Sequence, residues 1–169
     1  MKKLKPRILA QFAILTALEI VLSRFLSISA WSHKIGFSFV PVALAAMLYG
    51  PLPAGVIAAL ADFIGAILFP SGPFFPGFTL TAFLGGVTYG LAFGKKQTAI
   101  RILAAVLVRE FALSLMLNSL WISILYSSPF WPLLVSRFIQ CAVMTPVQFV
   151  VILLVAKTLP HRLLRGTAT

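Results

Sequence analysis

The stretch ILAQFAILTALEIVLSRFLSIS occupies residues 8–29 and follows the basic residues Lys2, Lys3, Lys5 and Arg7. Basic residues before an apolar run also describe a secretory signal peptide. This run is longer than the apolar region of a typical signal peptide, and no clear small-residue cleavage site ends it. We therefore interpret it as an uncleaved first membrane helix, since roughly 20 apolar residues are needed to cross a bilayer.

The composition of the whole chain agrees with a membrane location. The chain has 169 residues, of which 60% are hydrophobic and 10% charged, and its mean hydropathy is +1.04. Soluble domains are about half apolar and about a quarter charged. The chain therefore has too little polar surface to cover a water-exposed fold, and we expect residues 1–169 to form one membrane domain.

Turn-forming residues divide the chain into apolar segments. We expect an all-α, polytopic integral membrane protein with six transmembrane helices at about residues 8–29, 35–49, 52–69, 77–93, 99–126 and 133–159. The second segment is short and contains Pro41, so we expect it to be tilted or broken. The alternative is a re-entrant second segment, which would leave five spans and place the C-terminus outside.

The basic residues predict the orientation. Loops on the cytoplasmic side of membrane proteins are enriched in Lys and Arg. The opposite loops carry only Lys34, whereas one side collects Lys2, Lys3, Lys5, Arg7, Lys95, Lys96, Arg101, Lys157, Arg162 and Arg165. We therefore expect both termini in the cytoplasm. The net charge of +11 then belongs to membrane-flanking segments, and we expect no nucleic-acid partner.

Several ionisable residues fall inside the expected spans, where a charge is costly unless it meets a partner or a cavity. Arg24 and Arg137 lie near the outer ends of their spans, and the mid-depth set consists of Glu19, Asp62, Arg109 and Glu110. The mid-depth residues could serve only to hold the helices together. Arg24 and Arg137 could extend to the outer headgroups, but both have polar neighbours, and we expect at least one to bind a ligand.

Two spans carry polar stripes at helical spacing. One stripe in the fifth span comprises Glu110, Ser114, Asn118, Trp121 and Leu125, with Ser123 and Tyr126 nearby. The sixth span has Arg137, Cys141, Met144 and Gln148 on one face, with Gln140 at its edge. An amide, an aromatic plane and an arginine that converge from outside suit a flat heteroaromatic ligand with an acidic tail.

The first span also carries a pair of small residues, Ala13-x-x-x-Ala17, which would let another helix approach closely.

The motifs of nucleotide-binding proteins, metal sites and enzymes are missing from the sequence. No Gly-x-x-x-x-Gly-Lys-[Ser/Thr] loop is present for ATP. No His, Cys, Asp and Glu set has metal-ligand spacing, and no nucleophile has a base at motif spacing. We therefore expect neither an enzyme nor a metal site.

A family resemblance covers nearly the whole chain. Its most specific part is LNSLWISILY at residues 117–126, followed by Pro129-Phe130 and Arg137, and it continues in ALEIVLSRF (17–25), FVP (39–41), ADFIG (61–65) and FFPGFT (74–79). These stretches resemble the substrate-binding S components of energy-coupling factor (ECF) vitamin transporters, with the folate-specific branch as the nearest match. Folate-specific members tend to carry Thr where Ser119 stands and a basic residue near Gln140, which leaves open the folate form that is preferred.

The resemblance implies a high-affinity folate-binding subunit in the cell membrane, working with a transmembrane coupling protein and two ATPase subunits. Folate would be the transported ligand, with no cofactor. The coupling protein would contact Ala13 and Ala17. The pterin would stack on Trp121 and bond to Asn118, Arg24 and Arg137 would receive the glutamate carboxylates, and the remaining candidates for the pocket are Phe74, Phe75, Thr79, Ser123 and Tyr126. Alternatives are an S component for another vitamin, an intramembrane enzyme or a helical scaffold.

Overall fold

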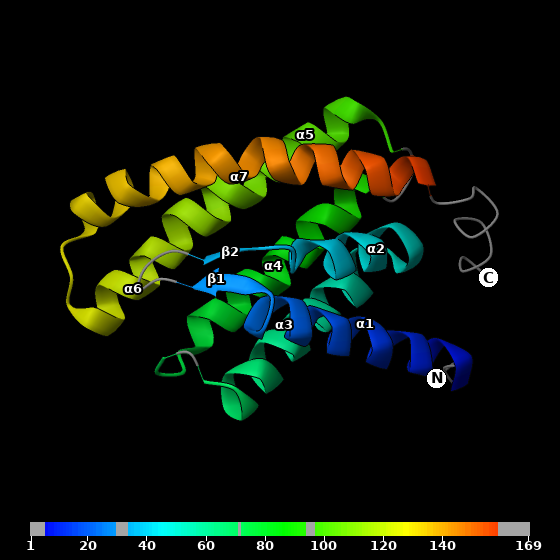
Figure 1. Cartoon of the computed structure of the whole chain (residues 1–169), viewed down its shortest axis with the longest axis horizontal. Coiled ribbons are helices and arrows are strands. Elements are labelled where there is room, and N and C mark those ends of the chain that lie inside the picture. The colour runs from blue at the N-terminus through cyan, green and yellow to red at the C-terminus, as the bar shows by residue number, and fades with distance from the viewer. Residues whose placement is uncertain (1–5, 30–33, 71, 94–96, 159–169) are drawn as a thin grey trace.

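The computed structural model of the chain describes residues 6–29, 34–70, 72–93 and 97–158. Helices form most of it (Figure 1). In chain order the elements are α1 (Pro6–Arg24), β1 (Ser27–Ser29), β2 (Lys34–Gly36), α2 (Phe39–Tyr49), α3 (Pro51–Leu68), α4 (Pro76–Phe93), α5 (Ala99–Leu107), the π-helix η1 (Val108–Leu117), α6 (Asn118–Tyr126) and α7 (Phe130–Thr158).

The predominantly helical architecture agrees with the expected fold class, but the first helix is shorter than the expected segment 8–29. It ends at Arg24, and β1 and β2 form a short antiparallel hairpin in which Ser27 pairs with Gly36. Pairing between strands satisfies the backbone groups of residues 27–29, which a helix would otherwise have satisfied. The second helix consequently begins only at Phe39 and has 11 residues.

The fifth expected segment is one continuous rod made of α5, η1 and α6, which together cover residues 99–126. Its centre is a ten-residue π-helix, in which backbone bonds join residues five apart instead of four. π-Helical segments are rare and frequently occur at functional sites. The rod packs along α7, which contains Pro146 inside its 29 residues (Figure 1).

Close backbone approach holds α2, α3 and α4 together. Gly50 ends α2 and precedes α3 with a φ of 86°, a conformation that favours glycine, and Pro51 then begins α3. Gly86 and Gly90 of α4 face the start of α3 so closely that a Cβ at Gly90 would lie 2.2 Å from Pro51 Cα. The second half of α4 therefore lies directly against the start of α3.

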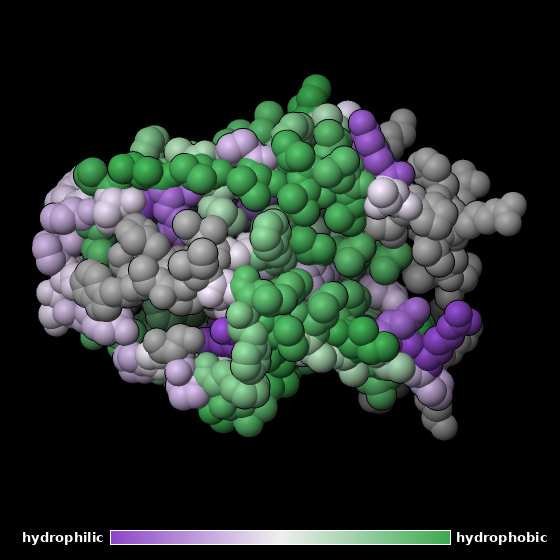
Figure 2. Space-filling view, in the orientation of Figure 1, coloured by the Kyte–Doolittle hydropathy of each residue, from purple (hydrophilic) through white to green (hydrophobic). Residues whose placement is uncertain are grey.

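The beginning of α1 and the end of α7 lie at the same end of the molecule, and the connection between α6 and α7 lies at the opposite end (Figure 1). Figure 2 shows hydrophobic side chains across the middle and hydrophilic ones gathered toward the two ends. Large apolar side chains such as Ile14, Leu68 and Leu154 are exposed on the long helices. By length and composition, three of the described helices could cross a membrane, namely α1, α3 and α7.

Candidate ligand-binding site

A cavity of about 370 Å³ lies between the end of α1, the start of α2, the second half of α3, the start of α4, the consecutive helices η1 and α6, and α7. Small-molecule sites in proteins usually occupy about 300–1,000 Å³ and combine apolar walls with a few well-placed polar groups. The charged residues that line this cavity are three arginines and three acids, namely Arg24, Arg109, Arg137, Glu19, Asp62 and Glu110. The cavity therefore has the size and the polar lining of a ligand site.

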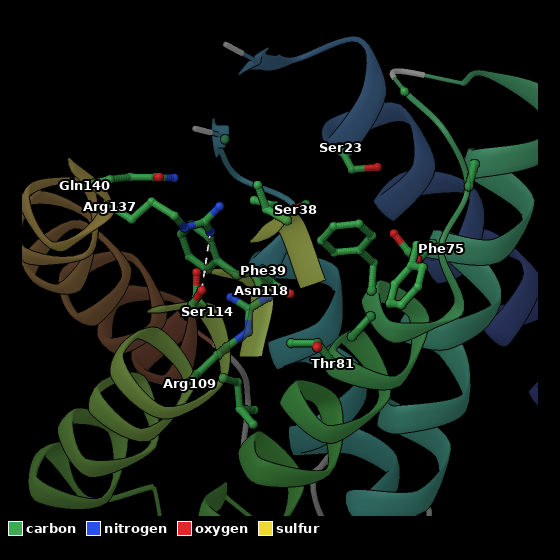
Figure 3. A pocket seen from close by; sticks show the side chains of 18 of the residues that line it. Ser23, Ser38, Phe39, Phe75, Thr81, Arg109, Ser114, Asn118, Arg137 and Gln140 are labelled. Carbon is green, nitrogen blue, oxygen red and sulfur yellow. Dashed lines mark hydrogen bonds between the residues drawn. The ribbon is translucent and has the colours of Figure 1, made fainter. Parts of the chain in front are cut away.

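One wall comes from α7 and from the junction of η1 with α6. Arg137 is 5% exposed, and its Nη2 donates to the backbone oxygen of Ser114 at 3.3 Å. Asn118 Oδ1 is buried and has no hydrogen-bond partner within the described residues. Arg137, Ser114 and Asn118 lie together on this side of the cavity, with Gln140 beyond Arg137 (Figure 3). Because a buried acceptor without a donor is costly, Asn118 is suited to a ligand that donates a hydrogen bond.

A second group of polar side chains forms a network beneath this wall. Gln148 Nε2 donates to Glu110 Oε1 at 2.7 Å, and Tyr89 Oη donates to Gln148 Oε1 at 2.8 Å. Arg109 lies 3.9 Å from Glu110 Oε1, and its guanidinium stands over the Tyr89 ring, 5.1 Å from the centroid. This network connects α4, η1 and α7. It gives the Glu110 carboxylate and the Arg109 guanidinium polar partners inside the molecule.

Across the cavity, α1, α3 and α4 contribute a third polar group. Thr79 Oγ1 donates to Asp62 Oδ2 at 2.9 Å, and Arg24 Nη2 lies 3.8 Å from Asp62 Oδ1. Arg24 and Asp62 line the cavity, whereas Thr79 lies behind Asp62 and does not. The structure thus places two arginines, Arg24 and Arg137, on different walls of one cavity.

Aromatic side chains complete the lining. Phe74 and Phe75 come from the segment before α4, and Phe78 from its first turn. The ring of Phe75 packs on Trp121 with 5.5 Å between centroids, and Trp121 Nε1 donates to Thr81 Oγ1 at 3.0 Å. Phe75 and Thr81 stand on the side of the cavity opposite Arg137 (Figure 3). Trp121 therefore supports the wall that Phe75 and Thr81 form, without lining the cavity itself.

The structure brings together most of the residues that the sequence singled out. The cavity lining includes Arg24, Phe74, Phe75, Asn118, Tyr126 and Arg137. Three other candidates, Thr79, Trp121 and Ser123, do not line it, and Ser123 Oγ instead donates to the backbone oxygen of Ser128 at 2.7 Å. Ala13 and Ala17 are exposed on α1, away from the cavity.

Other lining residues were not selected from the sequence as ligand contacts. Glu19 and Ser23 lie four residues apart on one face of α1, and Met144 and Gln148 lie on the Arg137 face of α7, so helical spacing could have identified these four. No sequence signal pointed to Ser38 at the start of α2. Among the described residues, no group of three or more His, Cys, Asp and Glu side chains could hold a metal ion.

Residues 7–156 match the model of the family described as "ECF transporter, substrate-specific component". The chain belongs to this family. The resemblance seen in the sequence is thereby confirmed, and the cavity between the helices belongs to the substrate-specific, or S, component of a transporter.

Individual relatives are consistent with this assignment. The S component is 41% identical over 149 residues to a folate transporter FolT of Clostridium novyi (strain NT), covering 88% of this chain and 87% of the relative. It is 37% identical to a folate transporter FolT of Leuconostoc mesenteroides subsp. mesenteroides over 153 residues, or 86% and 82% of the two chains. A crystal structure of FolT bound with folic acid matches with a TM-score of 0.88 and 33% identity, covering 92% of this chain and 96% of that one.

Proposed function

We propose that this S component binds folate with high affinity from outside the cell and delivers it to an ECF-type, ATP-driven importer. The observation that carries the proposal is the cavity that contains both the Arg137 guanidinium and the unpartnered Asn118 Oδ1, in a chain that is similar over most of its length to folate transporters. An S component for a different vitamin is the nearest alternative, and an intramembrane enzyme or a bare scaffold fits the family less well.

The chemistry of folate matches the cavity group by group. Folate combines a flat pterin ring, which carries an amino donor, with a glutamate tail that carries two carboxylates. Asn118 Oδ1 supplies an acceptor for a ring donor, and Phe74 and Phe75 supply apolar contact area. Arg137 and Arg24 supply guanidinium groups, which pair with carboxylates in a bidentate geometry.

The same proposal includes the membrane topology and the partner subunits of the protein. We infer six membrane crossings if α5, η1 and α6 count as one, with both termini in the cytoplasm of the cell. This topology is supported by the position of the start of α1 and the end of α7, which lie at the same end of the molecule (Figure 1). A transmembrane coupling protein would dock on α1 at Ala13 and Ala17, and two ATPase subunits would supply the energy.

Binding measurements on the purified protein test the proposal. Mass spectrometry of the small molecules that copurify should detect a folate, and calorimetry in detergent should show folic acid binding that other vitamins do not displace. Liposomes that contain only this protein should bind folic acid without ATP-dependent uptake. Displacement by a different vitamin, or concentrative uptake without the partner subunits, would contradict the proposal.

A further inference from the structure

A chain of polar contacts crosses three helices directly behind one wall of the cavity. Thr79 on α4 donates to Asp62 Oδ2 on α3 at 2.9 Å, and Asp62 Oδ1 lies 3.8 Å from Arg24 Nη2 at the end of α1. Arg24 Nη2 also donates to the backbone oxygen of Asp62 at 3.5 Å. Only Arg24 and Asp62 reach the cavity, so the Thr79 hydroxyl acts on the cavity through Asp62.

The Arg24 side chain can lie against α3 because residue 65 is a glycine. A Cβ placed on Gly65 would lie 2.9 Å from Arg24 Nε and 3.4 Å from Arg24 Nη2, closer than a side chain tolerates without displacement. The guanidinium therefore lies across Gly65, one turn along α3 from Asp62. These contacts with α3 hold the long side chain of Arg24, the last residue of α1.

We propose that Thr79 and Asp62 are positioning residues, which hold the Arg24 guanidinium at the cavity wall in the place where it receives a carboxylate of the ligand. This inference rests on the proposed function, because it requires a ligand with an acidic tail. A free arginine side chain loses considerable rotamer freedom when it binds a partner. Ordering it in advance removes that cost from the binding reaction and so raises the affinity.

The charge of Asp62 has an opposite effect that the test must separate, since a carboxylate beside Arg24 also repels an anionic ligand. Thr79→Val makes this separation, because it removes the hydroxyl that orients Asp62 and leaves the charges of Asp62 and Arg24 in place. We expect folic acid to bind about three- to tenfold more weakly to this variant, the effect of one hydrogen bond. Binding of a pterin without the tail should not change.

Two further variants on α4 serve as controls. Thr79→Ser keeps the hydroxyl and should restore the affinity for folic acid. Thr88→Val removes a hydroxyl that donates to the backbone oxygen of Leu84, at 2.8 Å on the same helix, and it should leave both affinities unchanged. A general loosening of α4 would instead affect both ligands in the Thr79 and Thr88 variants.

A double-mutant cycle decides whether Thr79 acts through Arg24. In an Arg24→Ala background, Thr79→Val should cause no additional loss of folic acid affinity. The inference is overturned if Thr79→Val binds folic acid as the wild type does, if it weakens the tail-less pterin equally, or if its effect persists without Arg24. Failure of the proposed function looks different, because the wild-type protein itself would then bind no folic acid.

Discussion

At the level of single residues, Arg137 and Asn118 offer the cavity two different kinds of polar atom. Arg137 brings a positive charge and donors, one of which is directed to the backbone of Ser114. Asn118 brings a buried acceptor. A ligand with a carboxylate at one end and a hydrogen-bond donor at the other matches both, which is the reason to test the two ends of folate separately.

Arg137→Ala should weaken folic acid binding about ten- to a hundredfold, because a charge-assisted hydrogen bond contributes roughly 1.5–3 kcal/mol and about 1.4 kcal/mol corresponds to a tenfold change. A pterin without the glutamate tail has no carboxylate for Arg137, so its affinity should change little. Calorimetry with the two ligands measures both effects. Arg101→Ala, at an exposed position on α5 outside the cavity, is the matched loss of one guanidinium and should leave both affinities intact. Equal losses for folic acid and the pterin would mean that Arg137 only holds α7 to η1.

Sequence spacing predicted some individual residues of the cavity wall and misplaced others. The spacing of 3.6 residues put Asn118 and Leu125 on one face, and both line the cavity. Trp121 was expected on that face but lies at its edge, because its indole N–H meets the Thr81 hydroxyl of α4. Helical spacing gives a direction around one helix, but it carries no information on which neighbouring helix offers a partner. Thr79, a pocket candidate that came from the family resemblance, lies behind Asp62.

At the scale of helices, α1 packs against α2 and α3 along one face and leaves its other face exposed. Thr16 and Glu19 are its buried residues, and both are polar. Ala13 and Ala17 face outward on it. A helix whose outer face is apolar and carries small side chains can accept a second helix at short distance in a membrane.

Ala13→Trp or Ala17→Trp should therefore separate two activities. Ligand affinity should remain near the wild-type value, because neither side chain lines the cavity. Uptake by the complete transporter, reconstituted with its coupling protein and ATPases, should be abolished, because the indole would block the approach of the partner helix. Leu154→Trp, on the exposed face of α7, should leave uptake unchanged. Parallel loss of binding and uptake would place the two alanines in the internal packing of the protein.

The contact between α3 and α4 predicts a stability effect of a different kind. Gly90→Ala would put a methyl group 2.2 Å from Pro51 Cα, so the two helices would have to separate. Overpacking of this sort costs about 1–3 kcal/mol, which should lower the melting temperature in detergent by roughly 3–10 °C. The neighbouring Leu91→Ala, at a position 71% exposed, should have little effect on it. A melting temperature equal to the wild type in Gly90→Ala would contradict this view of the packing.

The helices themselves were largely predictable, because turn residues such as Gly50 and Pro51 separate the apolar segments. The long rod occupies residues 99–126, the range expected for the fifth segment. Its π-helical centre and the hairpin after α1 were not predicted. A π-helix differs from an α-helix by one residue in the hydrogen-bonding pattern, and a three-residue strand is too short to produce a recognisable alternation of side chains.

At the scale of the whole molecule, the arrangement in Figure 1 leads to a prediction about the membrane. Cysteines introduced at Lys3 and at Thr167 should both be protected from an impermeant thiol reagent in intact cells, and should both react after the membrane is made permeable. The native Cys141 gives little background, since it is buried at 0% exposure. Labelling of either end from outside would contradict six crossings with both termini in the cytoplasm. Labelling at position 167 alone would favour the five-span alternative.

The contact between Trp121 and Phe75 also means that tryptophan fluorescence should report ligand binding in the cavity. Trp121 stands directly behind the cavity wall, whereas Trp131 is 76% exposed at the start of α7. The sequence contains three tryptophans, so replacing Trp31 and Trp131 with Phe would leave Trp121 as the single indole emitter. Its fluorescence should then change as ligand fills the space next to Phe75. Occupancy of the cavity could thus be followed in real time in the unlabelled protein.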